Sequence, residues 1–164
     1  LGIDKDTWSR YENKRVWEYD VTTSGFRYHM PNVNAAVGLI QMKKLKDFIK
    51  SRQNAVRKYD EAFKNNKNVE LLKKSYDTTS FFCYILKVKN GRRKEMMEHL
   101  KTQEVASGIH YIPNHHHSFF KDFPKGDLAV TEALEGEILT LPLYNMITEK
   151  EVAQVTSAVN SFKA

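Results

Sequence analysis

The sequence predicts a small α/β or α+β sandwich, in which helices pack against a short sheet. Hydrophobic side chains recur at helical spacing in several separate stretches. Between them lie short runs rich in aromatic and β-branched residues, which are typical of strands. The predicted order is helix, strand, helix, strand, helix, strand, helix. A chain of 164 residues, of which 41% are hydrophobic, is long enough for one such core.

A long helix is predicted over residues 32–64. Pro31 can open it, because proline has a suitable φ for the first turn and lacks an N–H that would need a partner. We expect a break near Lys46–Asp47 and an end at residues 65–68, where asparagines tolerate turn conformations. The apolar residues at helical spacing are Val33, Val37, Ile40, Ile49, Val56, Tyr59 and Phe63.

Shorter elements fill the rest of the chain. They are a strand at 81–89, a helix at 92–102, a strand at 108–113, a helix at 127–138 and a strand at 139–143. The last helix has the clearest signal, because Thr148 and Glu151 have the spacing of a capping box. The apolar stripe that follows consists of Val152, Val155, Val159 and Phe162.

The first thirty residues are rich in aromatic side chains but show no regular period. Such rings need a surface on which to be buried, so we expect residues 1–30 to be a strap or linker from a missing N-terminal domain. Residues 31–164 are then the predicted small domain. The chain does not start with Met or with a signal-peptide pattern, so we expect it to begin within a longer protein. The aromatic residues are Trp8, Tyr11, Trp17, Tyr19, Phe26 and Tyr28.

The net charge of +6 leaves two classes of partner open, nucleic acid and anionic small molecules such as a phosphate or a nucleotide sugar. The basic residues are interleaved with acidic ones and form no single stripe, so charge is weak evidence for nucleic acid. No stretch approaches the roughly 20 apolar residues of a membrane span. The single cysteine, Cys83, permits no disulfide within the chain, which favours a reducing compartment.

Two stretches contain residues suited to binding. Arg27 lies shortly before the predicted start of the long helix, where a guanidinium and a helix N-terminus both favour a phosphate. An ordinary loop arginine is the alternative. Residues 110–117 hold four of the six histidines. They favour hydrogen bonds to a substrate over a metal site, because three consecutive histidines on a loop point in different directions. A solvated loop is the third possibility.

No hydrolase triad, phosphate-binding loop, dinucleotide glycine motif or zinc-protease motif is present. No lysine lies in the apolar context that would lower its pKa for Schiff-base chemistry. The residues alone therefore identify no catalytic group and no metal site.

Several motifs together resemble the DegT/DnrJ/StrS family of sugar aminotransferases, which depend on pyridoxal 5'-phosphate. Residues 8–11 and 25–42 match in order, and residues 52–63 match the family's arginine-rich helix. Residues 110–117 read His-Tyr-Ile-Pro-Asn-His-His-His, which is similar to the family's His-Tyr-x-Pro-x-His-x-His loop. Residues 141–152 resemble its closing segment. The resemblance covers essentially the whole chain.

The resemblance implies the C-terminal domain of a cytoplasmic fold-type-I enzyme that is a homodimer with shared active sites. Its reaction moves an amino group from an amino acid, commonly glutamate, to a nucleotide-linked keto-sugar, as in amino-sugar and polysaccharide biosynthesis. The lysine that holds pyridoxal phosphate lies upstream of this chain, so the fragment is expected to be inactive alone. Nucleic acid and membrane are not expected partners.

Residue by residue, the resemblance places Arg27 on the cofactor phosphate of the neighbouring subunit, where the family usually has Asn or Lys. His29 stands where the family usually has Arg or Asn, and it is assigned to substrate. The residues that would line the sugar-nucleotide entrance are His110, Tyr111, His115 and His117. The alternative function is a non-catalytic dimerisation, small-ligand-binding or sensor module of the same family.

Overall fold

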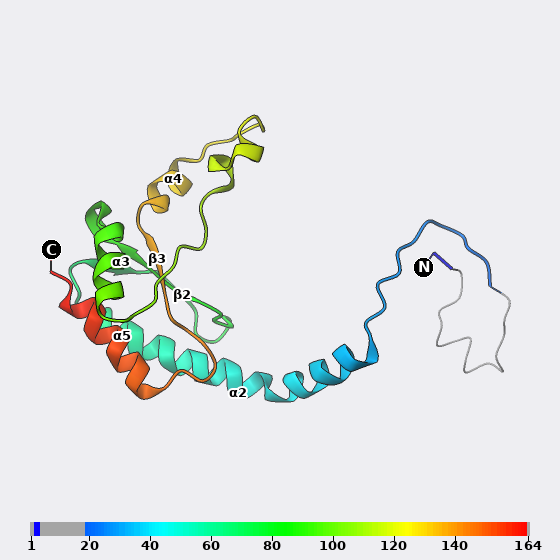
Figure 1. The fold of residues 1–164 in the computed structure, drawn as a ribbon, viewed down its shortest axis with the longest axis horizontal. Coiled ribbons are helices and arrows are strands. Elements are labelled where there is room, and N and C mark those ends of the chain that lie inside the picture. Colours follow the sequence, from blue (N-terminus) through cyan, green and yellow to red (C-terminus); the bar gives the residue numbers. More distant parts are fainter. Residues whose placement is uncertain (1, 4–18, 164) are drawn as a thin grey trace. The chain divides into compact units, whose positions relative to one another are not determined.

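The computed structural model describes residues 2–3 and 19–163, which form two compact units, Leu1–Lys43 and Lys44–Ala164 (Figure 1). Part of the predicted aromatic strap, including Trp8, Tyr11 and Trp17, lies outside the described residues. The motif at residues 8–11 lies outside them as well. The division into a strap at 1–30 and a domain at 31–164 stays a prediction.

Helix α2 spans Asn32–Phe63 and confirms the long predicted helix (Figure 1). The expected break near Lys46–Asp47 is wrong, because the helix runs through both residues. No glycine or proline lies between residues 39 and 63, so nothing in this stretch disfavours helical backbone. The buried residues are Ala55, Val56, Tyr59 and Phe63, all near the C-terminal end. The predicted apolar positions Val33, Val37 and Ile40 are exposed.

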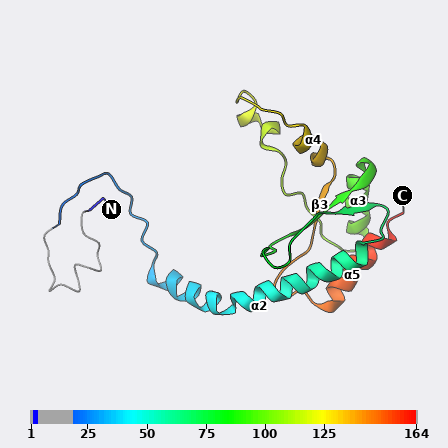
Figure 2. The ribbon, with the colours of Figure 1, turned by 180° about the vertical axis from the view of Figure 1, so that it is seen from behind.

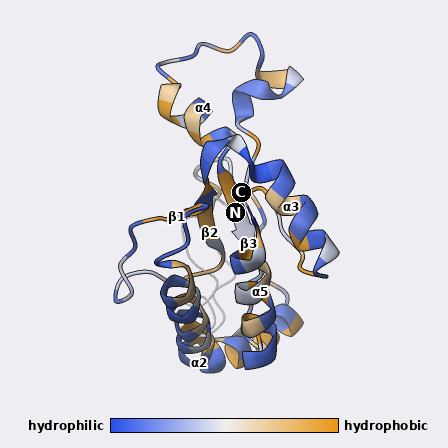
Figure 3. Ribbon diagram, turned by 90° about the vertical axis from the view of Figure 1, so that its left-hand side faces the viewer, coloured by the Kyte–Doolittle hydropathy of each residue, from blue (hydrophilic) through white to orange (hydrophobic). Residues whose placement is uncertain are grey.

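The sheet has three antiparallel strands in the order β1-β2-β3. Figure 2 shows β3 from behind, on the chain between helices α4 (Ala129–Glu135) and α5 (Glu149–Ser161). Their bounds are Val69–Leu71 for β1, Tyr84–Val88 for β2 and Ile138–Leu141 for β3. In the central strand β2, alternate residues are fully buried, which places one face of the sheet on the core. In Figure 3 the strands are coloured largely as hydrophobic, whereas much of α2 is hydrophilic.

Helices α3 (Arg93–Thr102) and α5 (Glu149–Ser161) join the C-terminal part of α2 around this core. The predicted capping box of α5 is confirmed. The backbone N–H of Glu151 donates to Oγ1 of Thr148 at 3.2 Å, and the Thr148 N–H donates to Oε2 of Glu151 at 2.7 Å. The side chains with 0% exposure are Val56, Tyr59, Leu86, Val88, Met96, Leu100, Leu139 and Val159. A small sheet packed by helices is therefore the fold, as predicted.

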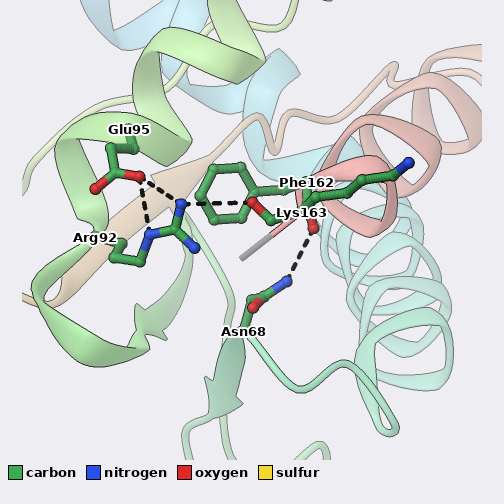
Figure 4. Close-up of polar contacts among 5 residues, drawn as sticks. All are labelled: Asn68, Arg92, Glu95, Phe162 and Lys163. Carbon is green, nitrogen blue, oxygen red and sulfur yellow. Dashed lines mark hydrogen bonds and ion pairs between the residues drawn. The ribbon is translucent and has the colours of Figure 1, made fainter.

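Phe162 and Lys163, which follow α5, contact residues just before β1 and just before α3 (Figure 4). Nδ2 of Asn68 donates to the carbonyl of Phe162 at 2.9 Å. The guanidinium of Arg92 lies 4.9 Å from the centre of the Phe162 ring and donates through Nε to Oε2 of Glu95 at 2.8 Å. Arg92 also donates to the carbonyl of Lys163 at 3.4 Å. These contacts fix the end of α5 on the core.

The segment between α3 and β3 differs most from its prediction. Instead of a strand at 108–113, a single antiparallel bridge joins Gly108 to Thr140. Two 3-10 turns follow, η2 (Asn114–His116) and η3 (Ser118–Phe120). Helix α4 spans only Ala129–Glu135, so the prediction over 127–138 was too long. The chain turns at Gly136, and Ile138 enters the sheet opposite Lys87. None of the helices in the described ranges could cross a membrane.

Candidate functional site

Residues 110–117, called the histidine loop from here on, are anchored to the sheet at their N-terminal end. The backbones of Gly108 and Thr140 exchange two hydrogen bonds, of 3.0 and 2.8 Å. Thr140 is 7% exposed, and its Oγ1 lies 3.0 Å from Nδ1 of His110. A Cβ at Gly108 would come within 3.1 Å of Cε1 of the same ring, so glycine leaves room for it. The sheet edge therefore fixes the position of His110.

Tyr111 extends the loop into solvent. Its side chain is 74% exposed, so a buried core role for this ring is excluded in the structure. The rings of His110 and Tyr111 meet edge to face, with centroids 4.9 Å apart and planes at 82°. The adjacent Ile112 is also exposed. The loop thus presents an imidazole, a phenol and an apolar side chain side by side, a combination suited to hydrogen bonding and stacking with a sugar or base.

The next two histidines turn toward helix α4. Nε2 of His115 lies 3.3 Å from Oε1 of Glu132, and Nδ1 of His116 lies 3.2 Å from Oε1 of Glu135. Glu132 and Glu135 are three residues apart, so they lie on the same face of α4. The His115 side chain is 13% exposed, less than the other members of this group. The pairing with α4 holds η2 in place.

His117 remains open to solvent. Its backbone N–H donates to the carbonyl of Asn114 at 3.0 Å, and its own carbonyl accepts from the N–H of Phe120 at 3.0 Å. Within the described ranges its ring makes no hydrogen bond or ion pair. Of the four predicted loop residues, His110 and Tyr111 are thus in contact, His115 faces α4, and His117 is exposed.

Arg27 and His29 belong to the first unit, whereas the histidine loop belongs to the second. Both side chains lie in an extended, exposed segment that leads into α2. The neighbouring rings of Phe26 and Tyr28 stack at 5.4 Å. The Arg27 guanidinium makes no ion pair with any described residue, and the first turn of α2 contains no acidic side chain. An anion is therefore the natural partner for this guanidinium.

A polar cluster that the sequence did not reveal lies between α2 and the sheet. Asp60 accepts hydrogen bonds from the hydroxyls of Tyr76 and Tyr84. It also forms an ion pair with Lys74, whose Nζ lies 2.5 Å from Oδ1. Burial, together with the hydrogen bond to Asp60, raises the pKa of Tyr76 to about 12. Arg57 lies 4.0 Å from the centre of the Tyr76 ring. Because its members are separated by up to 24 residues, no local pattern could have predicted the cluster.

The partly buried lysines of the described residues are all engaged in ion pairs. Only Lys74 and Lys87 are partly buried there, and both are ion-paired. Lys74 pairs with Asp60, and Lys87 pairs with Glu70 at 3.4 Å and with Glu137 at 3.1 Å. Carboxylates stabilise the charged ammonium, and a Schiff base requires the neutral amine. These two lysines are therefore unsuited to hold a cofactor covalently.

Comparison with known proteins decides the family. The profile of the DegT/DnrJ/EryC1/StrS aminotransferase family matches residues 1–160. The chain belongs to this family. Its resemblance to the DegT group, drawn from the motifs in the sequence, is confirmed.

Two curated relatives match nearly the whole chain. The uncharacterized protein MJ1066 of Methanocaldococcus jannaschii is 29% identical over 167 residues, and the match covers 96% of the chain and 43% of the relative. The spore coat polysaccharide biosynthesis protein SpsC of Bacillus subtilis is 28% identical over the same length, with the same coverage. The chain therefore spans less than half the length of these relatives.

Several solved structures share the fold. The aminotransferase TlmJ of Streptoalloteichus hindustanus is 25% identical with a TM-score of 0.78, covering 88% of this chain and 40% of its own. AtS13 of Actinomadura melliaura has a TM-score of 0.82 at 24% identity. The match covers 98% of this chain and 41% of AtS13. The sugar aminotransferase Spr1654 of Streptococcus pneumoniae, at 23% identity and a TM-score of 0.79, has been solved in its PMP form, with coverage of 98% and 41%.

Proposed function

We propose that the chain is the C-terminal portion of a pyridoxal-phosphate-dependent aminotransferase that acts on a nucleotide-linked keto-sugar. The amino donor in this proposal is an amino acid, most simply glutamate. Membership of the DegT family over residues 1–160 is the observation that carries the proposal. The names of the relatives support a sugar as acceptor, since they include a polysaccharide biosynthesis protein and a sugar aminotransferase.

In this proposal Arg27 binds the phosphate of pyridoxal phosphate in the neighbouring subunit of a homodimer. The exposed guanidinium without an acidic partner among the described residues fits a phosphate dianion, which it can bind through two parallel hydrogen bonds. When bound, the cofactor withdraws electrons from the carbon that carries the transferred amino group. Arg27 contributes retention and orientation of the phosphate, and His29, two residues further on, contacts the substrate.

The histidine loop orients the sugar nucleotide. Thr140 holds His110, so its imidazole is already oriented before substrate binds, which reduces the entropic cost of binding. Tyr111 offers an exposed ring and a hydroxyl, and His117 offers an exposed imidazole. His115 completes the predicted set if its ring leaves Glu132 when substrate enters. Each contact supplies positioning, and none is assigned a proton-transfer step.

The Schiff-base lysine is assigned to a part of the enzyme outside this chain. The two partly buried lysines of the described residues are neutralised by carboxylates, which supports that assignment. The 164-residue chain alone is therefore expected to bind phosphate-bearing ligands without forming a covalent bond to the cofactor.

Cofactor retention tests this proposal directly. In the full-length protein, Arg27→Ala should lose pyridoxal phosphate on dialysis faster than the wild type, because the trans phosphate contact is missing. Arg27→Lys keeps a positive charge and should retain most of the cofactor. Equal retention by the wild type and Arg27→Ala would contradict the role of Arg27. A full-length protein that never binds the cofactor would instead favour the non-catalytic module.

A further inference from the structure

The histidines that face α4 form a constellation that the proposed substrate role does not explain. One ligand atom from each of His115, His116 and Glu132 lies within 4.8 Å of the other two. We propose that these three side chains bind a divalent transition-metal ion, best matched by Zn²⁺, and that the ion ties η2 to α4. This proposal departs from the expectation of no metal drawn from the sequence, and its evidence does not depend on the aminotransferase reaction.

The distance between His115 and Glu132 suits two ligands of one metal ion better than a hydrogen bond between them. Nε2 of His115 is buried and has no hydrogen-bond partner, although Oε1 of Glu132 lies 3.3 Å away. In a tetrahedral zinc site with bonds of about 2.0–2.1 Å, neighbouring ligand atoms are roughly 3.3 Å apart. A cation between these two atoms would satisfy the nitrogen and bind the carboxylate at the distance already present.

His116 has the environment of a metal-binding imidazole. Its Nδ1 lies 3.2 Å from Oε1 of Glu135, so in the neutral ring the proton on Nδ1 points at a carboxylate. Nε2 then carries no proton and can bind a metal. A carboxylate on the second ring nitrogen is the usual partner of a histidine that binds zinc. The rings of His115 and His116 are 4.1 Å apart and nearly perpendicular, so they can approach one ion from different sides.

The three side chains give two nitrogen ligands and one carboxylate, a set that zinc accepts with water in the fourth position. Glu132 is 59% exposed, so the ion can enter from solvent and keep a water ligand. Two adjacent histidines could not close the site alone. Glu132, sixteen residues further along, supplies the third ligand because the side chains of η2 meet those of α4. Occupation would also remove His115 from the substrate-binding set, since one nitrogen cannot serve both.

Zinc titration of the full-length protein, free of any polyhistidine tag and stripped with a chelator, tests the proposal. Isothermal calorimetry with Zn²⁺ should show one site that Glu132→Gln and His115→Ala each weaken by about 10-fold or more. Glu135→Gln should weaken it less. His117→Ala and Glu98→Gln are the matched controls, because they remove a neighbouring imidazole and an exposed carboxylate outside the site, and they should leave the affinity unchanged.

Thermal unfolding gives a second reading that is independent of the calorimetry. Saturating Zn²⁺ should raise the melting temperature of the wild type by more than that of Glu132→Gln, because the variant binds the ion more weakly. The proposal is overturned if the wild type binds no zinc. It is also overturned if His117→Ala weakens binding as much as His115→Ala while Glu132→Gln has no effect, since the histidine run alone would then hold the ion.

Discussion

Nδ1 of His110 lies 3.0 Å from Oγ1 of Thr140, a pair of residues thirty positions apart that the sheet brings together. Thr140 is buried in β3, and its backbone also holds Gly108, two residues before the histidine. The hydroxyl therefore connects the rigid part of the molecule to the first residue of the proposed substrate loop. This connection makes His110 the loop residue whose position depends least on the ligand.

Thr140→Val should loosen His110 while leaving the volume of the buried side chain almost unchanged. A hydrogen bond of this kind is worth about 0.5–1.5 kcal/mol, so we expect the KM for the keto-sugar nucleotide to rise roughly threefold to tenfold. The kcat should change less, because the residue positions a binding group. Steady-state kinetics of the full-length enzyme measures both. Thr140→Ser keeps the hydroxyl and should restore KM, and a failure to do so would mean that only packing was lost.

Gly108→Ala should displace the His110 imidazole while leaving the backbone bridge to Thr140 in place. A Cβ at residue 108 would lie 3.1 Å from Cε1 of His110, so the imidazole must shift by a few tenths of an ångström. We expect a higher KM with a nearly unchanged melting temperature, since the bridge to Thr140 uses only backbone atoms. Gly126→Ala, where an added Cβ meets nothing, is the control. A large loss of stability in Gly108→Ala would show that the backbone, and not the ring, responds.

Asp60→Asn should destabilise the fold. The carboxylate accepts from two tyrosine hydroxyls and balances Lys74, whose side chain is only 13% exposed. The amide cannot balance that charge, and we expect a loss of about 1–3 kcal/mol in the free energy of unfolding. Urea denaturation measures it. Asp122→Asn, at an exposed position, should change stability by less than about 0.5 kcal/mol.

Glu151 should make the stability depend on acid pH. Hydrogen bonds from Tyr144 and from Thr148 lower the pKa of its carboxyl from 4.5 to about 2. The folded state therefore binds the proton less tightly than the unfolded chain, and the stabilisation is present above pH 4.5 and is lost as the pH falls toward 2. Glu151→Gln should flatten the dependence in this window. Identical acid unfolding curves for the two proteins would contradict the assignment.

Thr148→Ala removes the other half of the capping box. The N–H of Glu151 would lose its acceptor, and we expect the free energy of unfolding to fall by about 1 kcal/mol. Thermal or urea unfolding at neutral pH measures this loss. Thr148→Ser keeps the hydroxyl and serves as the control, which should stay close to the wild type.

Local signals in the sequence predicted most of the regular structure. The capping box at Thr148 and the apolar stripe from Val152 onward involve residues within a few turns of one another, so they could be read directly. Strand β1 was missed because three residues are too few to show a period. The α4 helix was predicted too long because Ile138 fits a helical face as well as a strand, and only the pairing with Lys87 decides between them.

The candidate site was predicted less completely than the fold. The family resemblance named the histidine loop, but not its support by Thr140 or its pairing with Glu132 and Glu135. Those contacts join residues that are separated by 17 to 30 positions, and no periodic pattern links them. Val33 and its neighbours on α2 show the reverse case, since their helical spacing was correct although their side chains are exposed.

The central claim is that this chain completes an aminotransferase whose covalent anchor lies outside it. Its most direct test is a single-turnover reaction of the full-length protein, loaded with pyridoxal phosphate, with glutamate in the absence of keto-sugar. The account predicts roughly one equivalent of 2-oxoglutarate per active site and none from the 164-residue chain treated in the same way. If a full-length protein that has bound the cofactor releases no 2-oxo acid, either from glutamate or from any other amino acid, the result would contradict it.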